Sequence, residues 1–543
     1  MVSGPTDDLL VLWRYARVVD GTGLWAAADG ARIVPVGREL LCDGDTPVGV
    51  YARLRAWARA EGQRLGDPLA AVTFLLESVG GGEHWARYSV VGVGCRAHLR
   101  GDLEGETLHM SVTPGPGLTL PEGIQDKRGL AVIEAMQRAY EGAAAPGLPR
   151  FWGGLVGVWG HDVVRVFEPI GPAPHAGDLP AIDLLATDLV VVFDNFSQRV
   201  QVIATACAET DGGLEEAKRR AMERVDVVAE VLRRPSPLQA QILTWDPPSA
   251  AQVNAPFSRD GFLAGVADAK GRISAGDIFQ IVLSQRFTAP RKGLDPLSVY
   301  RILRVTNPAP YMVLLELPSA SLAGASPEVL VRIDGAPGRQ TVTLRPIAGT
   351  RRRGRNDAED QALERELLAD PKERAEHLML VDLGRNDVGR VSLPGSVRVP
   401  QAFVIERYSR VMHIVSQVVG DLRPELRALD VLRATFPAGT LSGAPKVRAL
   451  EIIDQLEPAS RGWYGGAVGY LGYDGAADFS ICIRSVVFTD EEVRVQAGAG
   501  IVYDSDPVAE DAECHAKASA VIQAVAMARA VEAWAQDRGD NEA

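Results

Sequence analysis

The chain has 543 residues, 46% of them hydrophobic and 23% charged, which is typical of a globular protein and excludes disordered, collagen-like and coiled-coil chains. Its 57 Lys and Arg residues against 70 Asp and Glu give a net charge of −13, which opposes binding to nucleic acid or to an anionic membrane. Five scattered cysteines without a zinc-binding spacing predict a reducing, cytoplasmic location.

Residues 1–29 are expected to form an N-terminal extension. They carry Asp7 and Asp8 where a secretory signal would have basic residues. The sequence also contains no run of about 18 apolar residues, the length that a membrane span requires. We therefore expect a chain without a targeting signal or a membrane helix.

An N-terminal lobe is predicted over residues 30–234. The apolar run 189–193 and the alternating apolar residues of 200–203 predict a hairpin of buried strands. Apolar residues at helical spacing over 214–234, followed by Pro235, predict a helix that ends there.

A connection and a second lobe follow. The density of proline in 235–256 predicts an extended connection. Residues 257–525 alternate helix-like and strand-like segments and contain nearly all candidate catalytic residues, and 526–543 are expected to form a C-terminal tail. Function is therefore expected in residues 257–525.

Two segments of this second lobe, 370–377 and 509–517, each contain two glutamates spaced i and i+3. On a helix this spacing places both carboxylates on one face, so two such helices at one cleft would offer four oxygen ligands to a hard cation such as Mg²⁺. A solvated helix face is the alternative interpretation. The candidate ligands are Glu373, Glu376, Glu510 and Glu513.

Glycines precede the second glutamate segment. A strand predicted over 493–496 ends in Gly498-Ala499-Gly500. Missing Cβ atoms would let backbone N–H groups approach an anionic ligand, although tight packing is an equally good explanation. The segment 439–446 lacks the adjacent Gly-Lys-Ser/Thr of a nucleotide P-loop, so ATP is not indicated.

These segments, in this order, resemble the chorismate-utilising enzymes, and among them the large subunits (component I) of anthranilate synthases. The similarity covers roughly residues 30–525 through PIAGTRRRG (346–354), DPKERAEHLMLVDLGRND (370–387), HIVSQVVG (413–420), FPAGTLSGAPK (436–446), RGWYGGAVGYLGY (461–473) and QAGAGIVYDSDPVAEDAE (496–513). The resemblance implies an α+β fold of two packed antiparallel β-sheets surrounded by helices, with an N-terminal lobe that is regulated by tryptophan.

The resemblance also implies the activity. Enzymes of this group convert chorismate and ammonia to anthranilate and pyruvate through 2-amino-2-deoxyisochorismate, the first committed step of tryptophan biosynthesis. Glu376 and Glu513 would hold Mg²⁺, with Glu373 and Glu510 binding the metal or its waters. The catalytic residues would be Glu328 as general acid, His413 in the elimination of pyruvate, and Thr440.

The ligand-binding residues follow from the same resemblance. Chorismate would contact Gly349, Thr350, Tyr464, Arg484, Gly498, Ala499, Gly500 and Lys517. L-Tryptophan, as a feedback inhibitor, would bind Ser78 on one wall and Pro310, Tyr311 and Met312, together with Asn307, on the opposite wall.

Two positions indicate the nucleophile. Gln280 stands where similar isochorismate synthases have a lysine that activates water, and an amide cannot act as a general base. Ala348 stands where aminodeoxychorismate synthases often have a nucleophilic lysine. Ammonia is therefore expected. No cysteine lies in a Gly-x-Cys-x-Gly segment, and the resemblance implies a separate glutaminase subunit in a heterodimer or heterotetramer.

Two alternatives stay open, namely a synthase that stops at 2-amino-2-deoxyisochorismate and a catalytically silent regulator that binds an amino acid. The sequence also departs from its relatives at two places. Gly160-His161-Asp162 replaces a common Tyr-Asp pair, which we expect to affect packing only. Ala309 replaces a common serine near the inhibitor site, which predicts weaker inhibition.

Overall fold

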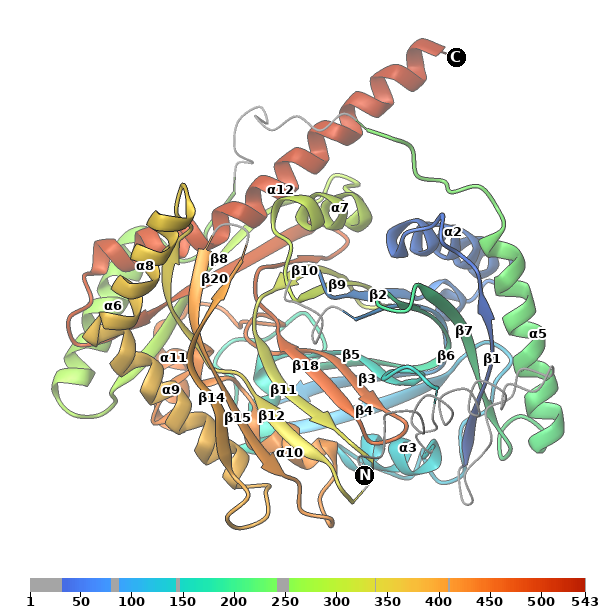
Figure 1. Ribbon diagram of the computed structural model, residues 1–543, viewed down its shortest axis with the longest axis horizontal. Coiled ribbons are helices and arrows are strands. Elements are labelled where there is room, and N and C mark those ends of the chain that lie inside the picture. The colour runs from blue at the N-terminus through green and yellow to red at the C-terminus, as the bar shows by residue number, and fades with distance from the viewer. Residues whose placement is uncertain are drawn as a thin grey trace, which may run out of the picture.

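The structure is a computed structural model, and it describes residues 32–79, 87–142, 147–241, 253–336, 338–408 and 411–542. The expected N-terminal extension, residues 1–29, lies outside these ranges, and so does 242–252 of the expected connection. Figure 1 shows strands in the centre of the molecule and helices around them. None of the helices in the described ranges is long and apolar enough to cross a bilayer.

All strand pairs between the named elements are antiparallel, and the pairing separates into two sheets that share two long strands (Figure 1). The first sheet has the order β1 (Ile33–Leu40), β7 (Arg199–Cys207), β6 (Ile182–Asp194), β3 (Tyr88–Glu104), β2 (Thr73–Glu77), β9 (Tyr311–Glu316), β10 (Ser321–Ser326), β19 (Ser485–Phe488), β20 (Glu492–Ile501), β8 (Gln280–Pro290) and β16 (Gly443–Ala444). The predicted hairpin is confirmed as β6 and β7, whose register pairs Leu189 with Ala204.

The second sheet continues from the other halves of β3 and β6. Its order is β4 (Thr107–Pro114), β3, β6, β5 (Gly154–Trp159), β17 (Ala467–Gly472), β18 (Ala477–Ile481), β11 (Val329–Asp334), β12 (Thr341–Leu344) and β15 (Val411–Asp421), with β13 (Ile347–Arg352) and β14 (Arg398–Arg407) also paired to β15.

Strand β3 changes sheets at a bulge. Its register against β6 shifts between Cys95 and Ala97, next to Gly94, which has a φ of +67°. A bulge bends a strand and increases its twist, so one strand can serve both sheets. Because β2 pairs with β9 and β5 pairs with β17, the segments before and after residues 235–256 share both sheets.

Helices cover the outer faces. The outer face of the first sheet packs against α2 (Pro47–Leu65), α5 (Leu214–Leu232), α7 (Pro296–Thr306) and α12 (Pro507–Glu542), which share one hydrophobic cluster with it. The predicted helix 214–234 is confirmed as α5. The remaining helices are α3 (Ala131–Ala139), α4 (Val164–Phe167), α6 (Arg259–Ser274), α8 (Asp357–Ala369), α9 (Pro371–Gly389), α10 (Ala428–Thr435) and α11 (Lys446–Leu456), with short 3₁₀ turns η1 (Pro68–Ala71), η2 (His161–Val163) and η3 (Gly439–Leu441).

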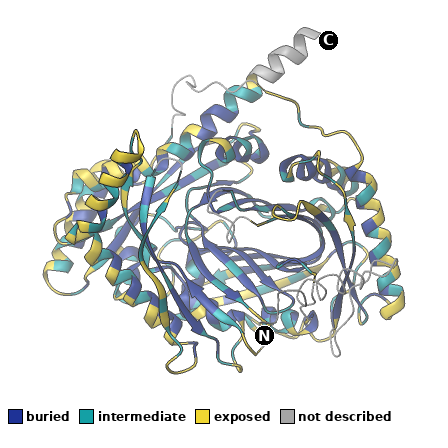
Figure 2. Ribbon diagram, viewed as in Figure 1, coloured by how far each residue is buried: buried dark blue, intermediate teal, exposed yellow. Residues whose placement is uncertain are grey.

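A second, larger hydrophobic cluster contains side chains from the strands of both sheets, including Phe74 of the first and Val156 of the second. Figure 2 shows the strands mostly buried and the exposed residues mostly on the outer sides of the helices. The apolar material of the chain therefore lies between the sheets and beneath the helices, as expected for a layered domain.

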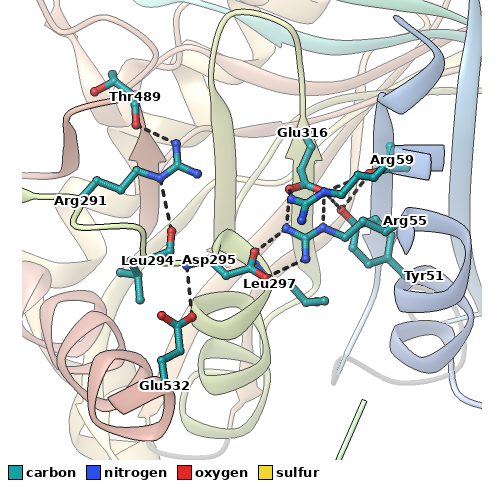
Figure 3. Close-up of polar contacts among 11 residues, drawn as sticks. Tyr51, Arg55, Arg59, Arg291, Leu294, Asp295, Leu297, Glu316, Thr489 and Glu532 are labelled. Carbon is teal, nitrogen blue, oxygen red and sulfur yellow. Dashed lines mark hydrogen bonds and ion pairs between the residues drawn. The ribbon is translucent and has the colours of Figure 1, made fainter. Parts of the chain in front are cut away.

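A buried ion cluster joins α2 to α7 and β9 (Figure 3). Arg55 on α2 donates to Asp295, the N-cap of α7, at 2.8 Å and to Glu316 at the end of β9 at 2.6 Å. Tyr51 also donates to Glu316 at 2.8 Å, and the backbone N–H of Asp295 donates to Glu532 of α12 at 3.2 Å. Charges removed from water depend on such partners for their stability.

We expect Arg55→Met to lower the free energy of unfolding by about 2–3 kcal/mol, because it removes the buried cation that bonds the largely buried Glu316 and the partly exposed Asp295. The Arg55 side chain is 7% exposed, whereas Arg59, which also pairs with Glu316, is 53% exposed. The control Arg59→Met should cost about 0–1 kcal/mol. Urea unfolding measures both, and equal losses in the two variants would contradict the prediction.

Candidate active site

A cavity of about 660 Å³ lies where the two sheets meet α9 and α12. Strands β8, β13, β15 and β20, the turn η3 and the loops that contain Glu328, Tyr464 and Arg484 supply the rest of its wall. It brings together every residue that the sequence assigned to catalysis, metal or chorismate, except Ala499. These lining residues are Glu328, Gly349, Thr350, Glu373, Glu376, His413, Thr440, Tyr464, Arg484, Gly498, Gly500, Glu510, Glu513 and Lys517.

Strand β20 continues through the glycine segment instead of ending at it. Ala499 is buried opposite Leu283, whereas Gly498 and Gly500 on either side of it line the cavity, as the two-residue period of a strand requires. A Cβ on Gly498 would lie 3.0 Å from the hydroxyl of Tyr464, and one on Gly500 would lie 3.0 Å from the amide nitrogen of Gln280. A Cβ on Gly498 would also lie 2.9 Å from the backbone carbonyl oxygen of Leu283, so close packing favours glycine most strongly at position 498.

Glu328 has a carboxyl group that remains partly protonated at neutral pH. It follows β10 and accepts a hydrogen bond from the Thr440 hydroxyl at 2.9 Å. Burial raises the pKa of its carboxyl to about 7, while that hydrogen bond and the charge of Lys517 oppose the shift. A carboxyl with such a pKa can donate a proton to a leaving group at neutral pH.

His413 is prepared as a base. It lies on β15 opposite Thr350 of β13, and its Nδ1 lies 3.0 Å from the carbonyl oxygen of Gly349 and 3.1 Å from the hydroxyl oxygen of Thr350. Because a carbonyl only accepts, Nδ1 carries the hydrogen and leaves Nε2 with a lone pair. Burial lowers the pKa of His413, which favours the neutral ring.

One wall of the cavity is cationic. Lys517 of α12 donates to the carbonyl oxygen of Gly498 at 3.0 Å, and Arg484 donates to the backbone carbonyl of Lys517 at 3.0 Å. Arg484 has a φ of +52°, a conformation that bulky residues rarely adopt outside functional sites. Two fixed cations beside each other suit a ligand with two carboxylates.

Both predicted glutamate helices are confirmed. Helix α9 begins at Pro371, and the side chain of Asp370 caps it by accepting from the backbone N–H groups of Lys372 at 3.0 Å and Glu373 at 3.3 Å. Helix α12 begins at Pro507 after Asp506, which accepts from Ala509 N–H at 2.9 Å. Local capping chemistry therefore sets where each glutamate pair starts.

The four carboxylates face a common space without meeting at a point. Burial raises the pKa of Glu376, and the charges of Glu373, Glu513 and Glu510 raise it further. Three of the carboxylates have cationic neighbours: Glu373 pairs with Arg351 at 2.9 Å, Glu376 with Lys372 at 3.9 Å, and Glu513 with Lys517 at 2.7 Å. In the described ranges no three His, Cys, Asp or Glu residues converge as a metal site. Carboxylate oxygens are nevertheless the type of ligand that a hard divalent cation binds, and such a cation would offset their mutual repulsion.

The residues that indicate the nucleophile also line the cavity. Gln280 begins β8 and faces the cavity, as does Ala348 of β13. Ile281 and Leu283 are fully buried on the opposite face of β8, whereas Phe279, which precedes the first residue of the strand, is exposed. The cavity wall at these two positions therefore contains neither a lysine nor another amine.

A second cavity of about 310 Å³ contains the predicted inhibitor residues Ser78, Pro310, Tyr311 and Met312. The Ser78 hydroxyl is buried and has no hydrogen-bond partner in the described part of the chain. Asn307 ends α7 and is absent from the cavity lining, and Ala309 is buried in the core and is also absent from it.

Sequence reasoning missed two charged residues of this second cavity, Asp478 and Arg150. Asp478 accepts a hydrogen bond from the Tyr311 hydroxyl at 2.8 Å and lies 3.4 Å from Arg150. Asp478 is a single acidic residue within the buried strand β18, and that isolated charge was the available signal. Arg150 precedes β5 in a loop and carries no such signal.

The match to known families agrees with this geometry. Residues 82–523 match the family described as chorismate binding enzyme. The anthranilate synthase component 1 of Pseudomonas aeruginosa is 45% identical over 511 residues, which cover 92% of this chain and 97% of that protein. That of Aquifex aeolicus is 42% identical over 506 residues, with coverages of 92% and 96%. The crystal structure of anthranilate synthase component I from Streptococcus pneumoniae superposes with a TM-score of 0.69 at 35% identity, covering 82% of this chain and 94% of that one.

The pKa of Glu328 makes stability depend on pH. Its ordinary value is 4.5, and about 7 in the folded chain means that the folded state holds the proton more tightly. The stability from this group is therefore complete below pH 4.5 and is lost as the pH rises through about 7. Glu328→Gln, which is always neutral, should be more stable than the wild type by roughly 2–3 kcal/mol at pH 8.

At pH 5 the difference in the free energy of unfolding between Glu328→Gln and the wild type should nearly disappear. Urea unfolding at both pH values measures this difference in stability between variant and wild type. The control is Glu425→Gln, a substitution at an exposed residue, which should show no such dependence on pH. A gap that is equal at pH 5 and pH 8 would show that the Glu328 carboxyl titrates normally.

Proposed function

The chain belongs to the chorismate binding enzyme family, and on that premise we propose that it catalyses the reaction of anthranilate synthase component I. Chorismate and ammonia would give anthranilate and pyruvate through 2-amino-2-deoxyisochorismate. The observation that carries the proposal is that Glu328, which retains its proton near neutral pH, and His413, which does not, line the same cavity.

The first half-reaction replaces a hydroxyl by an amine. Ammonia attacks the ring carbon C2, the double bond moves, and the hydroxyl on C4 leaves as water after it receives the proton of Glu328. Thr440 holds the acid through its 2.9 Å hydrogen bond, and Arg484 and Lys517 would bind the substrate carboxylates. Because Gln280 supplies no base for water, external ammonia is the nucleophile.

The second half-reaction removes pyruvate. His413 Nε2 would accept the proton from the carbon that carries the new amine, the bond to the enolpyruvyl oxygen breaks, and the ring becomes aromatic. The hydrogen bond from His413 Nδ1 to Gly349 keeps the ring oriented for this transfer. A synthase that stops at the aminated intermediate would have no use for this arrangement.

We propose Mg²⁺ as the metal, held by Glu376 and Glu513 with Glu373 and Glu510 beside it or its waters. Bound there, it would supply positive charge that offsets the carboxylate of the substrate. We also propose a separate glutaminase subunit as the source of ammonia and a cytoplasmic location. The five cysteines are free thiols, which supports a reducing compartment.

One experiment tests the activity. Purified chain with chorismate, MgCl₂ and an ammonium salt should yield anthranilate, followed by its fluorescence, and one pyruvate for each anthranilate. Glutamine in place of the ammonium salt should yield neither product without the partner subunit. Accumulation of the aminated intermediate alone would indicate the truncated reaction, and no consumption of chorismate would indicate a silent regulator.

Glu376→Gln and Glu513→Gln should each lower turnover by about 100-fold or more, because each removes one charged ligand from the metal. Calorimetry with MgCl₂ should show weaker binding in both variants. The control Asp382→Asn, at an exposed residue on α9, should change neither quantity. Wild-type affinity for Mg²⁺ in both glutamine variants would withdraw the metal assignment.

We further propose that L-tryptophan binds the second cavity and inhibits turnover. The Ser78 hydroxyl, which has no partner among the described residues, and the charges of Arg150 and Asp478 suit the amino and carboxylate groups of an amino acid. The apolar wall suits its side chain. Ser78→Phe should therefore abolish tryptophan binding by calorimetry and leave uninhibited turnover largely intact.

The control Ser197→Phe, in the exposed turn between β6 and β7, should keep full inhibition. Coupling between the sites must be reciprocal, so saturating chorismate should weaken tryptophan binding by the same factor that tryptophan weakens chorismate binding, typically about 5- to 150-fold. A tryptophan affinity that ignores chorismate would exclude this regulation.

A further inference from the structure

A buried ion pair lies directly behind the active-site cavity and takes no part in the chemistry described above. Arg461 donates to both carboxylate oxygens of Glu457, the C-cap of α11, at 2.6 and 2.9 Å. The two side chains are 2% and 5% exposed. Replacing such a pair by apolar residues is often neutral or stabilising, so stability alone does not account for it.

The remaining donors of Arg461 reach two parts of the cavity wall. Its Nη1 donates to the carbonyl oxygen of Leu441 at 2.6 Å, and its Nη2 donates to that of Val282 at 2.8 Å. Leu441 and Val282 both line the cavity, and Leu441 adjoins Thr440. The guanidinium therefore fixes the backbone next to the hydroxyl that holds the general acid.

Glu457 reaches a third part of the wall through Ser284. Its carboxylate accepts from the backbone N–H of Ser284 at 2.8 Å and from its hydroxyl at 2.9 Å. The same hydroxyl oxygen accepts from the side-chain amide of Gln496 at 2.8 Å, and Gln496 lines the cavity. One ion pair thus joins η3, β8 and β20.

Arg461 of this ion pair also contacts residues 160–162, a segment in which this sequence departs from its relatives. His161 is buried, with Nε2 3.5 Å from Arg461 Nη1. Burial and the charges of Arg461 and Arg165 lower its pKa well below the ordinary value, so the ring is neutral and can accept from the guanidinium. The departure at 160–162 therefore contributes a polar contact as well as packing.

We propose that Arg461 and Glu457 are positioning residues of this active site, which hold the turn at Thr440 and the walls at Val282 and Gln496 so that Thr440 meets the Glu328 carboxyl. The catalytic consequence rests on the proposed function, whereas the positioning itself concerns only the folded chain. Simultaneous hydrogen bonds to the carbonyl oxygens of Leu441 and Val282 and to the Glu457 carboxylate require the planar guanidinium of arginine. Lysine has a single ammonium group and cannot reproduce this geometry.

Arg461→Lys tests the geometry while it keeps the charge. The first readout is the titration of Glu328 by NMR in protein labelled with ¹³C at glutamate carboxyls, without substrate, with Glu328→Gln for assignment. Loss of the Thr440 hydrogen bond should move this titration to higher pH than in the wild type, because that bond stabilises the charged carboxylate. Lys517, whose charge also lowers the pKa of Glu328, is unchanged in the variant.

The second readout is turnover. kcat should fall on the order of tenfold or more with a smaller change in the KM for chorismate, because the acid is displaced while the substrate-binding cations remain. Glu457→Gln, which keeps the shape of the side chain, should move both readouts in the same direction. Thermal unfolding monitors whether each variant is folded.

Arg165→Lys is the matched control. Arg165 is equally buried in the neighbouring cluster and pairs with Asp162 at 3.2 Å and Asp454 at 2.7 Å, but donates to no residue of the cavity wall. It should leave the Glu328 titration unchanged and lower kcat less than twofold. Equal effects of Arg461→Lys and Arg165→Lys, or an unchanged Glu328 titration in both Arg461→Lys and Glu457→Gln, would overturn the proposal. A wild-type chain without turnover would refute the proposed function, and the NMR titration would still decide the positioning.

Discussion

The register of β10 against β9 sets the relation between the two cavities of this molecule. Tyr311 of β9 pairs with Ser326 of β10, and Glu328 follows Ser326 by two residues. Strand β9 therefore contributes to the second cavity, and the end of β10 leads to the proposed general acid in the first. The hydrogen bond from Tyr311 to Asp478 continues the connection into β18, and six residues after Asp478 the chain reaches Arg484. A ligand that prefers one arrangement of these strands would therefore act on both the acid and the substrate-binding cations.

Burial supports the two proton-transfer roles proposed for Glu328 and His413. Desolvation disfavours charge, so the same enclosed surroundings raise the pKa of Glu328 and lower that of His413. The acid therefore keeps its proton and the base stays without one near the same pH. The hydrogen bonds from Thr440 and to Gly349 then fix the direction of each group without a change in the covalent chemistry.

Features with local signals could be predicted from the sequence. The glutamate pairs of α9 and α12 lie on helices because capping residues and spacing specify them, and the hairpin of β6 and β7 follows from alternation and an Asp-Asn turn. The similarity of long motifs also predicted the candidate catalytic residues, which line one cavity. Ala499 shows the limit, since only the pairing with Leu283 reveals which residues of the glycine segment face the cavity.

Contacts between distant segments had no such signal. Arg461 is 20 residues from Leu441, 179 from Val282 and 300 from His161, and no periodicity links these positions. Two of its acceptors are backbone carbonyls, which every residue has, so side-chain identity at those positions does not disclose the contact. The only trace in the sequence is an arginine four residues after a glutamate, which also describes many solvated surface pairs. The contacts of the buried Arg461 guanidinium are therefore specified by the fold as a whole. The proposed role of Arg461 follows only from the structure, in which the segments that it joins enclose one cavity.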